Sequence, residues 1–123
     1  VEAADGTDPL AATLDWALER LDQPLTVEML SRQALMSPRT FARRFRTVTG
    51  TTPLQWLLRQ RILHAQGLLE ATDLPVELIA QRCGFGSEET MRRSFLRQIA
   101  VTPQDYRARF RQAASARHVK KLV

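Results

Sequence analysis

Four arginines lie within residues 39–46, and their side chains are suited to contacts with phosphate or guanine. They are Arg39, Arg43, Arg44 and Arg46, with no acidic residue among them. A guanidinium donates in a planar fork that pairs with phosphate oxygens or with O6 and N7 of guanine. A run of charge is more often a solvated face, so the element that carries the run decides between these interpretations.

A helix over this segment separates charge from apolar side chains. At 100° per residue, Arg39, Arg43 and Arg46 share one face. The opposite face carries the apolar side chains Phe41, Phe45 and Val48. No acid lies four residues away to neutralise the arginines. We therefore expect buried phenylalanines and an outward arginine face.

The segment belongs to a repeat. "VEMLSRQALMSPRTFARRFRTVTGTTP" from Val27 aligns with "VELIAQRCGFGSEETMRRSFLRQIAVTP" from Val76, with one residue inserted in the turn. The shared positions pair Ser37 with Ser87, Thr40 with Thr90, Arg43 with Arg93, Phe45 with Phe95, and Thr52–Pro53 with Thr102–Pro103. Serine is a favoured N-cap and proline a favoured first helical residue. The pattern predicts two helix-turn-helix motifs, at about residues 26–50 and 75–100.

The remaining segments also favour helix, so we expect an all-α fold of about seven helices. A linker helix is predicted over about 53–71, with an apolar stripe of Leu58, Ile62, Ala65 and Leu69. Further helices are predicted over about 9–21 and 103–114. A linker of this length spans roughly 28 Å at 1.5 Å per residue. Successive major-groove segments on one DNA face lie about 34 Å apart, so both motifs could enter together.

Charge is distributed unevenly along the 123 residues, whose formal net charge is +5. Residues 1–28 are acidic, residues 29–69 contain no acid, and residues 101–123 are basic. Such asymmetry favours a face that binds a polyanion. We interpret residues 1–8 as a linker, 9–112 as a DNA-binding domain and 113–123 as a basic C-terminal tail, at the end of a longer protein.

Several functions are disfavoured. Cys83 is the lone cysteine, which excludes an intramolecular disulfide and fits the reducing cytoplasm. His64 and His118 stand apart, and no metal-ligand or phosphate-loop spacing occurs. We expect no enzyme activity, no metal and no cofactor. No signal peptide or apolar run near twenty residues is present, so no membrane association is expected.

The second motif presents a different outward face. Glu89, Arg93 and Leu96 point outward, with Arg92 and Arg97 beside them. Glu89 could accept from a cytosine amino group, and Leu96 could meet a thymine methyl or a protein partner. Glu89 could equally serve, with its acidic neighbour, as a partner of the positive end of the helix dipole.

The motifs "MSPRTFARRF…GTTPLQWL" and "IAQRCGFGS…F…VTPQDYR" resemble the DNA-binding domain of the AraC/XylS family of bacterial transcription regulators. The resemblance covers roughly residues 9–112 and is greatest to the subgroup that includes GlxA and AdpA. It implies a monomeric module that reads adjacent major-groove segments, with dimerisation through an N-terminal domain absent here. One departure is Ala100, where the family carries a glycine such as Gly50.

The resulting assignment of residues to DNA has two classes. The base-contacting residues are expected to be Arg39, Arg43, Arg46, Glu89, Thr90 and Arg93. The phosphate-contacting residues are expected to be Ser37, Thr40, Arg44, Thr52, Gln55, Arg59, Ser87, Arg92, Arg97 and Thr102. Double-stranded DNA and RNA polymerase are the expected partners, in the cytoplasm at the nucleoid. The alternative is a basic helical adaptor that binds an acidic protein or RNA.

Overall fold

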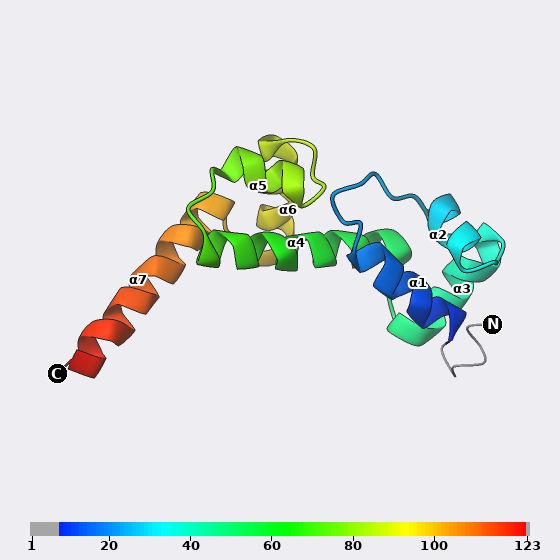
Figure 1. The fold of residues 1–123 in the computed structure, drawn as a ribbon, viewed down its shortest axis with the longest axis horizontal. Coiled ribbons are helices and arrows are strands. Elements are labelled where there is room, and N and C mark those ends of the chain that lie inside the picture. Colours follow the sequence, from blue (N-terminus) through cyan, green and yellow to red (C-terminus); the bar gives the residue numbers. More distant parts are fainter. Residues whose placement is uncertain (1–7, 123) are drawn as a thin grey trace. The chain divides into compact units, whose positions relative to one another are not determined.

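The computed structural model describes residues 8–122, with side chains up to His118. Its described part is all α, as predicted (Figure 1). The helices are α1 (Pro9–Leu18), α2 (Val27–Gln33), α3 (Pro38–Thr49), α4 (Pro53–Ala71), α5 (Val76–Arg82), α6 (Glu88–Ile99) and α7 (Pro103–Leu122). The predicted linker over residues 1–8 lies almost entirely outside the described residues.

The chain divides into two compact units, residues 1–60 (unit one) and 61–123 (unit two). Each unit contains one of the predicted helix-turn-helix motifs, α2–α3 in unit one and α5–α6 in unit two. The helix α4 is continuous over the predicted range and contributes its first turns to unit one and its later turns to unit two.

The first motif folds as its caps and apolar spacing predict. The hydroxyl of Thr26 accepts from the backbone of α2, and the hydroxyl of Ser37 accepts from the backbone of α3. Both helices bury apolar side chains, and Leu30 and the two phenylalanines of α3 are fully buried. The core of unit one closes with Leu10, Ala17, Leu21, Leu25, Ala34 and Leu57.

Aromatic pairs in the two units confirm the repeat. Phe45 meets Trp56 edge-on at 5.9 Å between ring centroids, and Phe95 meets Tyr106 edge-on at 6.4 Å. In each unit, the second helix of the motif is thus packed against the start of the next helix. Edge-on pairs add about 0.5–1.5 kcal/mol beyond the burial of their area. These contacts hold the outward faces of α3 and α6 in place.

Two expectations about apolar side chains were wrong. Val48 is 66% exposed, because the buried stripe of α3 is centred on Phe41 and Phe45 and is narrower than the predicted apolar face. At the start of α4, Leu57 is buried and Leu58 only half-buried. The stripe changes face because the first turns of α4 pack in unit one and the turns from Ile62 pack in unit two.

Two helix ends also differ from the prediction. Helix α1 ends at Leu18 rather than about residue 21, since the chain then tightens into turns in which the amide of Arg20 donates to the carbonyl of Ala17. Helix α7 continues beyond Ala114 to Leu122. After Pro103, the segment contains neither glycine nor proline and is rich in alanine, arginine and glutamine, which sustain helix. The predicted tail of residues 113–123 is therefore helical through Leu122.

The end of α6 keeps the expected form although its glycine is missing. Gly50 ends α3 with φ +79°, and Ala100 ends α6 with φ +63°. The amide of Ala100 donates to the carbonyls of Phe95 and Leu96, which holds the alanine in the left-handed region. Alanine in this region costs about 1–2 kcal/mol relative to the right-handed helix.

Ala100→Gly is therefore expected to stabilise the protein by about 0.5–1 kcal/mol. Relief of the left-handed strain exceeds the added entropy of glycine in the unfolded chain. Chemical denaturation followed by circular dichroism measures the change. Ala108→Gly is the matched control, since Ala108 is exposed in the interior of α7, where glycine costs about 1 kcal/mol. Destabilisation by both substitutions would contradict the strain at Ala100.

Candidate nucleic-acid interface

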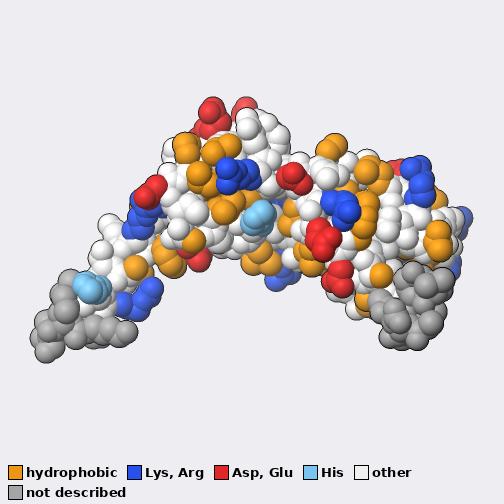
Figure 2. Space-filling model, viewed as in Figure 1, with side chains coloured by type: hydrophobic (Ala, Val, Ile, Leu, Met, Phe, Trp, Pro, Cys, Tyr) orange, Lys and Arg blue, Asp and Glu red, His pale blue; other side chains and the backbone are white. Residues whose placement is uncertain are grey.

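The arginine face of α3 is exposed along its length. The hydroxyl of Ser37 accepts from the amide of Thr40 at 3.2 Å and begins the helix. Arg39, Arg43 and Arg46 are all exposed, as is Arg44 on the flank. The structure thus brings these four arginines to one helix, on the side away from the buried phenylalanines. In the view of Figure 2, several basic side chains of unit one lie over α2 and α3, and acidic ones lie near the end of α1, with a basic one among them.

The start of α4 forms a reciprocal capping box. The hydroxyl of Thr52 accepts from the amide of Gln55 at 3.2 Å, and the side-chain oxygen of Gln55 accepts from the amide of Thr52 at 3.4 Å. The hydroxyl of Thr51 donates to the same Gln55 oxygen at 2.8 Å. This cap fixes the helix start beside the end of α3. Arg59, also predicted to contact phosphate, is exposed one turn further along α4.

The outward face of α6 is partly neutralised. The amide of Thr90 donates to the Ser87 hydroxyl at 3.1 Å, and that hydroxyl donates to the Thr90 hydroxyl oxygen at 3.0 Å. Glu89 and Arg93 form an ion pair at 3.7 Å between Oε2 and Nη1. The neighbouring side chains of this face are exposed: Arg92, Leu96 and Arg97. At the next helix start, the hydroxyl of Thr102 accepts from the amide of Asp105 at 3.1 Å.

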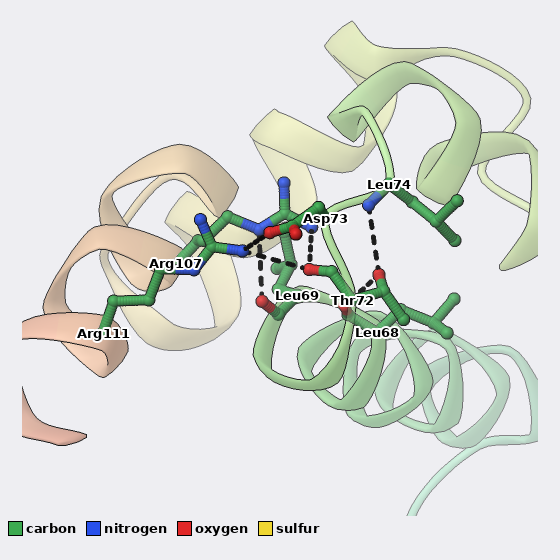
Figure 3. Close-up of polar contacts among 7 residues, drawn as sticks. All are labelled: Leu68, Leu69, Thr72, Asp73, Leu74, Arg107 and Arg111. Carbon is green, nitrogen blue, oxygen red and sulfur yellow. Dashed lines mark hydrogen bonds and ion pairs between the residues drawn. The ribbon is translucent and has the colours of Figure 1, made fainter.

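Two arginines of α7 serve the fold, a role that sequence reasoning missed. The Nε of Arg107 donates to the carbonyl of Leu69 and its Nη2 donates to the carbonyl of Thr72, each at 3.1 Å (Figure 3). Arg111 donates to the same Thr72 carbonyl at 3.2 Å and pairs with Asp73. These bonds satisfy carbonyls that the end of α4 leaves without helical partners. Sequence reasoning counted both arginines only as basic residues of the C-terminal stretch.

Neighbouring groups tie α7 to α4 in the same place. The hydroxyl of Tyr106 donates to the carboxylate of Glu70. Loss of solvation, with the nearby Glu70, raises the pKa of Tyr106 to about 12, so its hydroxyl stays protonated and can donate. Loss of solvation, then repulsion from Arg111, lowers the pKa of Arg107 from its ordinary value.

Arg107→Leu is expected to destabilise the protein by about 1.5–3 kcal/mol, the range for hydrogen bonds from charged donors. The substitution keeps an aliphatic stem but removes the donors to the carbonyls of Leu69 and Thr72, and only Thr72 still accepts from Arg111. Arg109→Leu is the control, because Arg109 is exposed on the same helix and its substitution removes the same charge. Denaturant titration of the two variants measures the difference. Equal midpoints would show that the bonds to α4 contribute nothing.

Cys83 lies in the core of unit two and not at a reactive site. The side chain is fully buried, and its position in the repeat corresponds to buried Ala34. Burial raises the pKa of the Cys83 thiol to about 11. Because the thiolate is the nucleophilic form, the thiol is unreactive at neutral pH. Within residues 8–122, no cluster of three or more metal-ligating side chains occurs, and no helix is long and apolar enough to cross a membrane.

Two helix-turn-helix motifs, each with a capped second helix that buries two or more apolar side chains and exposes its polar face, define a double helix-turn-helix protein. The family described as "Helix-turn-helix domain" matches residues 30–109. The chain belongs to this family, and its resemblance to the AraC type is confirmed.

Individual relatives agree with this assignment. The DNA-binding domain of AdpA, solved in complex with a target DNA, is 50% identical, with a TM-score of 0.84 over 87% of this chain and 96% of that chain. RclR of Escherichia coli, a transcriptional activator, is 40% identical over 105 residues, or 85% of this chain. SoxS of Salmonella typhimurium is 35% identical over 96 residues, or 78% of this chain and 90% of SoxS.

The chain spans only part of some relatives. It covers 37% of RclR and 31% of Rv1931c, a transcriptional regulator of Mycobacterium tuberculosis that is 46% identical over 81 residues. The C-terminal domain of AraT from Geobacillus stearothermophilus has the same fold, with 24% identity and a TM-score of 0.79.

Proposed function

We propose that residues 9–112 bind double-stranded DNA in a sequence-specific manner, as the DNA-binding domain of a bacterial transcription regulator. The observation that carries this proposal is the face of α3, where three exposed arginines stand opposite two buried phenylalanines and no acid lies on the helix. The second helix of such a motif is the element that enters the major groove. The AdpA domain, which shares half of its residues with this chain, was solved with its target DNA.

The residue roles follow from exposure and helix position. Arg39, Arg43 and Arg46 would contact bases from α3, and Arg93 and Thr90 would contact bases from α6, with Glu89 beside Arg93 on the same face. Phosphate contacts would come from the helix starts and the flanking arginines: Ser37, Thr40, Arg44, Thr52, Gln55, Arg59, Ser87, Arg92, Arg97 and Thr102. Amides at a helix start and guanidinium groups both favour phosphate, and so would set the register on the duplex.

The same proposal includes the cellular setting. A transcription regulator of this kind would act in the cytoplasm at the nucleoid and would contact RNA polymerase. The relatives RclR and Rv1931c are a transcriptional activator and a transcriptional regulator, respectively. We propose that the domain binds as a monomer and that oligomerisation, where it occurs, depends on further domains.

Selection from a pool of random duplexes, followed by footprinting, tests the proposal. A selected duplex should displace a labelled ligand far better than a scrambled duplex of the same length, a single strand or RNA. Discrimination between these competitors matters more than salt dependence, because any polyanion binds this basic surface electrostatically. Equal displacement by RNA or by an acidic protein would favour the adaptor alternative and overturn the proposal.

A further inference from the structure

The two recognition helices carry opposite charges at one equivalent position. When α3 and α6 are aligned on their serine N-caps, Arg39 corresponds to Glu89 and Arg43 corresponds to Arg93. In α3 these positions, four residues apart, form an arginine–arginine pair that stays open to a ligand. In α6 the same positions form a glutamate–arginine pair. The two faces therefore differ in the sign of the charge at this position, in addition to the replacement of Arg46 in α3 by Leu96 in α6.

The glutamate and arginine of α6 are already in contact. The Oε2 of Glu89 lies 3.7 Å from Nη1 of Arg93, with the side chains 76% and 67% exposed, respectively. Glutamate four residues before a cation is the favourable order on a helix. Both side chains stand on the polar face, away from buried Met91 and Phe95. Any DNA that meets this face meets the carboxylate together with the guanidinium.

We infer that Glu89 is a positioning residue that sets the sequence specificity of α6 by acting on Arg93. The inference rests on the function proposed above. A carboxylate at the face repels phosphate whatever the base sequence, and it competes with phosphate for the guanidinium. A guanine that accepts two hydrogen bonds from Arg93 compensates for this repulsion, whereas a single phosphate contact does not.

Glu89 would thus widen the difference in affinity between suitable and unsuitable DNA sequences without strengthening binding to either. Specificity rises when binding to the wrong sequence is weakened more than binding to the right one. Glu89 lowers the contribution of α6 to non-specific binding, and α3 has no such residue. Arg93 should therefore add affinity only where the bases suit it, whereas Arg39 and Arg43 of α3 have no carboxylate beside them that limits contact with phosphate.

Glu89→Gln tests the inference, with Glu88→Gln as the matched control. Both substitutions remove one negative charge from the first turn of α6, but only Glu89 is paired with Arg93. Affinity is measured over a range of salt for the duplex recovered by selection and for a scrambled duplex. We expect Glu89→Gln to tighten scrambled binding about 3–10-fold and to steepen its salt dependence by about 0.9 in log–log slope, the value for one more phosphate contact. The ratio of selected to scrambled affinity should fall.

A double substitution shows whether Glu89 acts through Arg93. In an Arg93→Ala background, the effect of Glu89→Gln on base preference should disappear, as a coupled pair requires. The inference is overturned if Glu89→Gln leaves the affinity ratio unchanged or matches Glu88→Gln. It is also overturned if Glu89→Gln weakens only the selected duplex at one C·G pair, since Glu89 would then contact the base itself. A parent protein that fails to distinguish selected from scrambled duplex would overturn the proposed function, independently of either variant.

Discussion

Phe45→Ala and Phe95→Ala are each expected to reduce the free energy of unfolding by about 3–5 kcal/mol, the usual cost of removing a buried phenyl ring. Both rings are fully buried, and each meets an aromatic ring of the following helix. A loss of this size is a large part of the stability of a small protein, which is about 5–15 kcal/mol. Denaturant unfolding followed by circular dichroism measures it.

Val48→Ala is the control on the same helix as Phe45. Because Val48 is 66% exposed, its truncation should change stability by no more than about 0.5 kcal/mol. Phe45→Leu should retain part of the packing and remain folded if Phe45→Ala does not. Alanine variants with the stability of the parent would contradict the burial of the two rings. A large effect of Val48→Ala would restore the sequence-based placement of that residue.

The helices could be predicted from the sequence because the features that indicate them are local. Serine and threonine caps, a proline in the first turn and apolar residues at helical spacing all act within one or two turns. They placed α4 at its observed bounds, and the two motifs at about residues 26–50 and 75–100, the ranges that contain α2 with α3 and α5 with α6. The repeat added independent support, since Phe45 and Phe95 recur at equivalent places. The arginine face of α3 was predictable for the same reason.

Contacts between residues far apart in the sequence could not be predicted from it. Nothing near Arg107 in the sequence indicates that its guanidinium caps the end of α4, 35 to 38 residues earlier. A count of basic residues treats Arg107 and Arg43 alike, yet one is engaged with backbone carbonyls and the other is exposed. The same limit explains why the burial of Val48 and Leu58 was wrongly predicted. Periodicity gives the direction of a side chain but not the extent of the surface that covers it.

The end of α6 shows a local signal that was overridden. Ala100 stands where the family carries a glycine, and alanine avoids the left-handed region in which such a helix end places it. Ala100 nevertheless has φ +63°, and its amide donates two hydrogen bonds to carbonyls of α6 that hold this conformation. Leu35, with φ +60° in the turn of the first motif, is a second such residue, where the second motif has Gly84. Packing of the two helices around each turn outweighs the preference of a single residue.

Simultaneous replacement of Arg39 and Arg43 by alanine is expected to abolish sequence-specific DNA binding while leaving the fold intact. Each arginine that pairs bidentately with guanine contributes about 1–3 kcal/mol of discrimination. Together they would lower the affinity for the selected duplex about 30-fold to 10⁴-fold, since about 1.4 kcal/mol is tenfold. Stability should not fall, because like charges four residues apart on a helix repel each other.

Arg92 and Arg97 supply the matched control. They are two exposed arginines of α6 that flank the recognition face, so their replacement removes the same charge. Their loss should weaken selected and scrambled duplexes by similar factors and reduce the salt dependence, as expected for phosphate contacts. Titrations of both duplexes with each double variant measure the difference. If the two double variants behave alike, the arginines of α3 contact phosphate and do not read bases.

Arg93→Ala extends the comparison to α6. Because Arg93 is paired with Glu89 and has no second arginine at the position of Arg39, its loss should leave a weakened but recognisable site. Each base pair of the selected duplex is then changed in turn. We expect strong base preference, including a G·C pair, at the positions where the Arg39 and Arg43 double variant no longer discriminates. About one helical turn away, at the positions where Arg93→Ala no longer discriminates, the base preference should be weaker. Equal base preference in both parts, or a larger loss from Arg93→Ala than from the α3 double variant, would contradict this asymmetry.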